Sequence, residues 1–166
     1  MAEINNNLNK NNILKKIKSK YIVMRIFENL KQIKLLDIIH YNKKYQKLMN
    51  IKLIDYKREY SKIEIEIIPE ENQYDKFINI SKNNESHYHI YFNDNIEEIK
   101  RININKGEKV NKIKVIIDYK IKSLSNLFNG RDCIKKINFI KFNRKDITDM
   151  SSMFDGCLSL KEINFN

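Results

Sequence analysis

The segment Ile121-Lys-Ser-Leu-Ser-Asn-Leu-Phe-Asn-Gly130 recurs 26 residues later as Ile147-Thr-Asp-Met-Ser-Ser-Met-Phe-Asp-Gly156. With the same offset, Ile134-Lys-Lys-Ile-Asn-Phe139 recurs as Leu160-Lys-Glu-Ile-Asn-Phe165. We term residues 121–139 the first copy and residues 147–165 the second copy. A constant period of this size is typical of a solenoid, in which each unit buries its apolar side chains against its neighbours. The repeat therefore predicts a short solenoid at the C-terminal end.

Each copy divides into a turn and a strand. Apolar residues at spacings of three and four predict a short helical turn, and a glycine ends it where a left-handed backbone is needed. The strand that follows alternates between apolar and polar positions. Its polar positions face away from the predicted core and are the predicted protein-binding surface of the solenoid. These positions are Lys136, Asn138, Glu162 and Asn164.

The second copy resembles the repeat of the BspA-like leucine-rich repeat proteins. The similarity lies in Thr148-Asp149-Met150-Ser151, followed by Met153-Phe154 and Gly156-Cys157. In the first copy, Arg131 stands where the motif has cysteine. The resemblance implies a leucine-rich repeat fold and protein binding. Many members of this family are surface proteins, so the resemblance also offers the cell surface as an alternative location.

Residues 13–60 carry apolar side chains at helical spacing and predict several short helices. Within this region, Ile26-Phe27-x-x-Leu30 is followed by Leu35-Leu36 and by Asn42-Lys43-Lys44-Tyr45-x-x-Leu48. This spacing resembles an F-box, the helical module that docks a Skp-type adaptor of a ubiquitin ligase. Lys18-Ser19 replaces the leading Leu-Pro of that motif, and Tyr45 replaces its tryptophan. The alternative is an ordinary helical core. The resemblance implies that the adaptor contacts are Ile26, Phe27, Leu30, Leu35, Leu36 and Tyr45.

The chain as a whole is predicted to be an α+β protein with four segments. Residues 1–12 form an Asn-rich, disordered tail, and residues 13–60 the helical F-box-like module. Residues 61–111 form a β-rich capping region, because the alternation of Ile and Glu over 63–67 is strand spacing. Residues 112–166 hold the leucine-rich repeats.

The net charge of +11 allows two interpretations. One is a partner of negative potential, which could be nucleic acid, an anionic membrane or an acidic protein. The other is a compositional bias of the coding sequence, since the lysines are spread along the chain instead of forming one block.

The histidines and cysteines do not predict a catalytic or metal-binding site. His87 and His89 lie two residues apart on a predicted strand, but a metal site needs further ligands in fixed geometry. Cys133 and Cys157 are expected to be buried thiols, with a disulfide between the copies as the alternative. No nucleophile motif or phosphate-binding glycine loop is present. We therefore expect no catalytic residue, no metal and no cofactor.

The polar N-terminal sequence is not a signal peptide, and no apolar run reaches the roughly 20 residues of a membrane span. These features predict an intracellular, cytoplasmic protein. The predicted function is a non-enzymatic protein–protein interaction module built on the repeats. The first alternative is an F-box-type substrate adaptor of a ubiquitin ligase, and the second is a basic nucleic-acid-binding protein.

Overall fold

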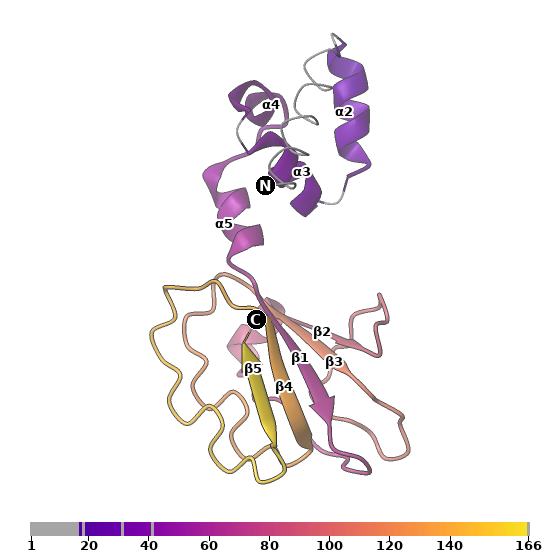
Figure 1. Cartoon of the computed structure of the whole chain (residues 1–166), viewed down its shortest axis with the longest axis vertical. Coiled ribbons are helices and arrows are strands. Elements are labelled where there is room, and N and C mark those ends of the chain that lie inside the picture. The colour runs from indigo at the N-terminus through magenta and orange to yellow at the C-terminus, as the bar shows by residue number, and fades with distance from the viewer. Residues whose placement is uncertain (1–16, 18, 31, 41, 166) are drawn as a thin grey trace. The chain divides into compact units, whose positions relative to one another are not determined.

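The structure, a computed structural model, describes residues 17, 19–30, 32–40 and 42–165 (Figure 1). The chain separates into two compact units, Met1–Glu59 and Tyr60–Asn166. Each unit has its own hydrophobic core. The tail predicted over residues 1–12 lies outside the described residues.

The N-terminal unit consists of short helices. Ser19 and Asn42 precede two of them, and their side-chain oxygens accept hydrogen bonds from the Ile22 and Tyr45 amides, as N-cap residues do. Phe27 and Tyr45 meet edge to face, with ring centroids 5.7 Å apart. The described helices are α2 (Lys20–Glu28), α3 (Gln32–Ile39), α4 (Lys43–Leu48) and α5 (Leu53–Tyr60). The buried side chains that hold this unit together are Val23, Phe27, Leu35, Ile39 and Tyr45.

The C-terminal unit is built on one mixed five-stranded sheet in the order β2-β3-β1-β4-β5 (Figure 1). Neighbouring strands pair antiparallel, except for β4 and β5, which pair parallel. A short 3-10 helix, η1 (Lys82–His87), precedes β2. The strands are β1 (Ile63–Pro69), β2 (Tyr88–Phe92), β3 (Ile113–Ile117), β4 (Ile134–Lys141) and β5 (Glu162–Phe165).

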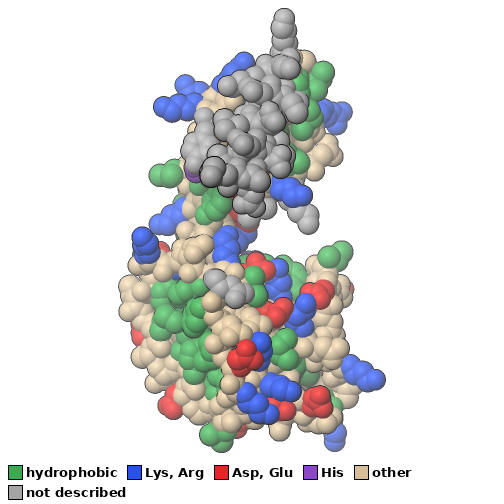
Figure 2. Space-filling view, viewed as in Figure 1, with side chains coloured by type: hydrophobic (Ala, Val, Ile, Leu, Met, Phe, Trp, Pro, Cys, Tyr) green, Lys and Arg blue, Asp and Glu red, His purple; other side chains and the backbone are tan. Residues whose placement is uncertain are grey.

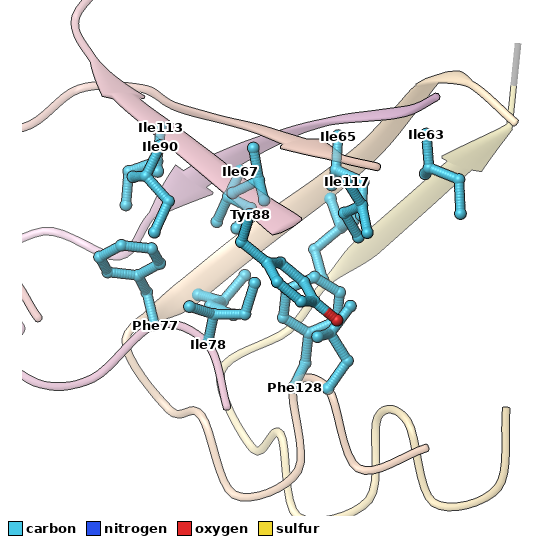
Figure 3. Packing of buried hydrophobic residues seen from close by; sticks show 14 of the residues in the cluster. Ile63, Ile65, Ile67, Phe77, Ile78, Tyr88, Ile90, Ile113, Ile117 and Phe128 are labelled. Carbon is cyan, nitrogen blue, oxygen red and sulfur yellow. The ribbon is translucent and has the colours of Figure 1, made fainter. Parts of the chain in front are cut away.

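The core of this unit follows from the alternation of β1. Ile63, Ile65 and Ile67 are fully buried, whereas Glu64 and Glu66 between them lie on the outer face of the sheet. Successive side chains of a strand point to opposite faces, so one face can be apolar and the other polar. Figure 3 shows the buried isoleucines of β1, β2 and β3 converging with aromatic side chains from the loops.

The prediction of an α+β chain that ends in a leucine-rich repeat solenoid is wrong. The strand of the first copy, β4, pairs antiparallel with β1 on one side and parallel with β5 on the other. The copies therefore extend a mixed sheet that begins with β2, β3 and β1, and do not form a separate solenoid stacked on a capping region. The physical reason is that β1 buries its apolar face in the same core as both copies.

The two copies nevertheless lie side by side with the offset that the sequence repeat has. Ile137 pairs with Ile163, and Phe139 pairs with Phe165. The Phe139 and Phe165 rings are stacked, with centroids 4.4 Å apart and planes 2° apart. Phe128 and Phe154 are also stacked, at 5.8 Å and 10°. Equivalent residues of the two copies thus contact each other directly.

Arg144, between the copies, is a buried polar residue that the sequence analysis did not single out. Its side chain is 1% exposed and forms an ion pair with Asp146 at 2.6 Å. Its guanidinium donates hydrogen bonds to four backbone carbonyl groups, those of Ser61, Asp118, Tyr119 and Ile121. Arg144 thus joins the start of β1, the end of β3 and the first copy. Its bonds are charge-assisted, and such hydrogen bonds are among the stronger ones.

Candidate functional site

The predicted binding residues Lys136, Asn138, Glu162 and Asn164 lie together on the outer face of β4 and β5. Lys136 forms an ion pair with Glu162 at 2.9 Å. The Asn164 side-chain amide donates to the Asn138 Oδ1 at 2.9 Å, and Asn138 donates to Glu66 of β1 at 3.0 Å. Hydrogen bonds from Asn164 and then from Lys136 lower the pKa of Glu162. These side chains therefore bond to one another across the strands.

The rest of the outer face continues this pairing of charges. Lys112 lies 2.6 Å from Asp94 and 3.7 Å from Glu66, and Lys114 forms an ion pair with Glu64. Figure 2 shows basic and acidic side chains intermixed on the visible face of this unit. A phosphate backbone is attracted by lysines that lack carboxylate neighbours. The excess positive charge is therefore not gathered as free cations on this part of the sheet.

The end of the second copy leaves several apolar side chains exposed. Leu124, Ile137 and Phe139 of the first copy are buried, because the second copy packs against them. The equivalent residues of the second copy are substantially exposed. Their exposed fractions are 38% for Met150, 37% for Ile163 and 58% for Phe165. Figure 2 shows a hydrophobic area beside β5, over the loop that precedes this strand.

We term this surface the open end of the second copy and define it by Met150, Phe154, Leu158, Ile163 and Phe165. Leu158 is exposed and Phe154 is half-buried. Exposed apolar patches of this kind typically mark interaction surfaces. The apolar pattern of the second copy is the same as that of the first copy, and it indicates which face a side chain occupies but not whether a neighbour covers it. The available signal was the place of Phe154, Ile163 and Phe165 in the second of two copies.

The six predicted adaptor contacts differ in accessibility. Phe27, Leu35, Leu36 and Tyr45 are buried. Phe27, Leu35 and Tyr45 belong to the core of the N-terminal unit itself. Leu30 is half-buried and packs against the same core. Ile26 is exposed, and it lies on α2 with two further exposed apolar side chains. These are Tyr21 and Ile22.

The two histidines on which a metal site was considered make contacts with carboxylates. His87 Nδ1 lies 3.6 Å from Asp118, and His89 lies 3.2 Å from Glu98 and 3.9 Å from Asp118. Glu98 also forms an ion pair with Lys100. Within the described residues, no group of three or more His, Cys, Asp or Glu side chains is placed to hold a metal ion.

Both cysteines are free thiols. Cys133 is buried and donates to the Lys76 carbonyl at 3.2 Å, while Cys157 is half-buried and donates to the Phe128 carbonyl at 2.9 Å. Burial raises the pKa of Cys133 to about 11 and also raises the pKa of Cys157. A thiol with a raised pKa is a poor nucleophile, since the thiolate is the reactive form.

None of the described helices is both long and apolar enough to cross a lipid bilayer. Comparison of the chain with protein families, with curated proteins and with solved structures finds no match.

Proposed function

We propose that this chain is a non-enzymatic protein-interaction protein, and that its C-terminal unit binds a polypeptide partner at the open end of the second copy. The observation that carries the proposal is the contrast between equivalent residues of the two copies. Phe139 is buried by Phe165, whereas Phe165 is 58% exposed. A partner that covered the open end would bury apolar and aromatic surface, which is the main source of affinity at the centre of interfaces.

Two matched substitutions test this proposal. Ile163 at the open end and Ile140 on the outer face of β4 are 37% and 43% exposed. Lysine at either position adds the same charge with a similar loss of apolar surface. We expect proteins captured from the source cells by the full chain to be lost with Ile163→Lys and retained with Ile140→Lys.

Folding of both variants is checked by thermal denaturation before capture. Retention of every captured protein by Ile163→Lys would contradict the proposal. Loss with Ile140→Lys alone would assign binding to the outer face, where Lys136, Asn138, Glu162 and Asn164 lie.

The exposed apolar face of α2 supports a second candidate, docking of a Skp-type adaptor by the N-terminal unit. A Phe27→Asp change does not test it, because Phe27 is buried and its loss would unfold the unit. Ile26→Lys is the suitable variant, since Ile26 is exposed. Leu53→Lys on α5 is the control, because Leu53 is also exposed. Co-purification of a Skp-type protein that Ile26→Lys abolishes and Leu53→Lys leaves intact would support this role.

A further inference from the structure

The positive charge of the chain is concentrated in the N-terminal unit. Residues 1–59 contain 14 Lys and Arg against 5 Asp and Glu, a net charge of +9. Residues 60–166 contain 18 against 16, a net charge of +2. A bias of the coding sequence would act on both units, so it does not explain why carboxylates are scarce in one of them. Charge of one sign on one unit indicates a partner of the opposite sign for that unit.

The helix α4 carries three of these cations and no carboxylate. Lys43, Lys44 and Lys47 are exposed, and none of them forms an ion pair with a residue that the structure describes. Asp55, the carboxylate that follows α4 in the sequence, lies 4.0 Å from Arg58 instead. The α4 lysines thus lack the carboxylate neighbours that the lysines on the outer face of the sheet have.

Two of these lysines line an open hollow of about 420 Å³, together with Gln46, Asn50 and Ile51. Lys43 and Lys47 lie four residues apart on α4, so their side chains are neighbours on one face of the helix. The carbonyl groups at the end of α4 are already satisfied, since the Asn50 amide donates to Lys47 at 3.2 Å and the Ile51 amide donates to Gln46 at 2.9 Å. The hollow therefore presents cations and a side-chain amide to an anion, with no carboxylate in its lining.

The apolar side chains of α4 favour nucleic acid over a lipid surface as the source of that anion. Tyr45 is buried, and Leu48 is half-buried against the same core. A helix that lies on a membrane combines its cations with exposed apolar side chains, and α4 exposes none. Leu53, which is 85% exposed at the start of α5, is an apolar side chain that a bilayer could use, so it serves as a test position below.

The absence of an exposed ring on α4 favours a duplex over a single strand. Tyr45 is the aromatic residue of this helix, and its ring packs against Phe27 in the core. Proteins that bind single strands stack successive bases on aromatic side chains. A duplex instead presents its phosphates outward, with one charge per about 1.7 Å of helix axis. Lysines without a stacking partner fit this second surface.

We infer that the N-terminal unit binds the phosphate backbone of double-stranded nucleic acid, and that Lys43, Lys44 and Lys47 contact the phosphates. This surface is separate from the open end of the second copy, so the inference goes beyond the proposed function and does not depend on it. Phosphate contacts carry no sequence information, so duplexes of unrelated sequence bind equally. Each neutralised phosphate releases counterions, and the affinity falls as salt is added.

The test measures binding of the full chain to a short fluorescein-labelled duplex by fluorescence anisotropy over a range of salt concentrations. The test variant combines Lys43→Gln, Lys44→Gln and Lys47→Gln. The control combines Lys106→Gln, Lys109→Gln and Lys122→Gln, which remove the same charge from exposed positions of the C-terminal unit. We expect the slope of log affinity against log salt to become less steep by about 2.7 in the test variant, about 0.9 per lysine, and to stay unchanged in the control.

All six lysines are exposed, so both variants should keep the melting temperature of the wild type. If the triple test variant does not fold, Lys44→Gln alone should make the slope less steep by about 0.9. A DNA duplex and an RNA duplex are compared, and salt-dependent binding of either one supports the inference. Vesicles of phosphatidylcholine and phosphatidylserine in equal parts are the membrane probe, with Leu53→Ser as the variant that weakens insertion.

Several results would overturn the inference. They are no binding of either duplex, an equal change of slope in the test variant and the control, tighter binding of a single strand of the same sequence, and a strong preference among unrelated duplexes. Vesicle binding that Leu53→Ser weakens, without binding of a duplex, would assign the surface to lipid.

Discussion

The repeat provides two phenylalanines that differ in burial and in little else. Phe139 and Phe165 occupy the same position of the two copies, and their rings are stacked at 4.4 Å, but their exposed fractions are 0% and 58%. Truncation of a buried phenylalanine to alanine costs about 3–5 kcal/mol of unfolding free energy. Scaling that cost by the buried share of Phe165 gives about 1–2 kcal/mol for Phe165→Ala. We therefore expect Phe139→Ala to be the more damaging variant by at least about 1 kcal/mol.

The assay is urea denaturation of the full chain, followed by circular dichroism, with the transitions of the two units fitted separately because a two-unit chain need not unfold in one step. A Phe→Leu change at each position is the control, since it keeps most of the apolar volume and should narrow the difference between the positions. Equal losses for the two alanine variants, or a greater loss for Phe165→Ala, would refute the reasoning that the open end is uncovered.

Three further predictions concern single groups. Arg144→Met should lower the unfolding free energy by about 3–5 kcal/mol, because buried carbonyls lose their donor. Lys145→Met, at the exposed neighbouring position, is the control and should change it by less than about 0.5 kcal/mol. Both are measured by thermal denaturation, and similar effects of the two changes would contradict the prediction. Ser152→Asn should raise the unfolding free energy by about 0.5 kcal/mol, because asparagine tolerates the left-handed backbone at φ 49° better than serine does. A lower melting temperature of this variant would contradict the prediction. The hydrogen bond from Lys100 lowers the pKa of Glu98 in the folded chain. The contribution of ionised Glu98 to stability is therefore complete above the pKa that Glu98 has in the unfolded chain. It is lost as the pH falls through the lower pKa that Glu98 has in the folded chain. Glu98→Gln should therefore lose less stability than the wild type between about pH 5 and pH 3, and parallel curves for the two proteins would argue against this account.

Local patterns predicted the parts of the fold that depend on neighbours in the sequence. The alternation of Ile63, Ile65 and Ile67 with glutamates predicted β1. The constant offset predicted that the two copies would pack against each other, as the stacked rings of Phe128 and Phe154 do. The pairing of β1 with β4 could not be predicted in this way. It joins residues far apart in the chain, such as Glu66 and Asn138, which are separated by 72 positions. The isoleucine alternation of β1 and β3 fits either strand as the neighbour of β4.

The candidate site was predicted only in part. Alternation placed Lys136 and Asn138 on the outer face, where they lie, but it could not indicate that Glu162 and Glu66 would bond to them. The exposure of Phe165 depends on what packs beside it, which is a property of the tertiary structure. A pattern that is the same in both copies cannot tell a covered ring from an uncovered one.

The two thiols differ in burial, so their reactivity can be used to measure partial unfolding. Cys157 donates to the Phe128 carbonyl across the contact between the copies, whereas Cys133 lies in the core next to β4. Detachment of the second copy alone would expose the Cys157 thiol to an alkylating reagent and leave the Cys133 thiol protected. The ratio of the two modification rates in native buffer therefore compares the frequency of local detachment of the second copy with the frequency of unfolding of the whole C-terminal unit.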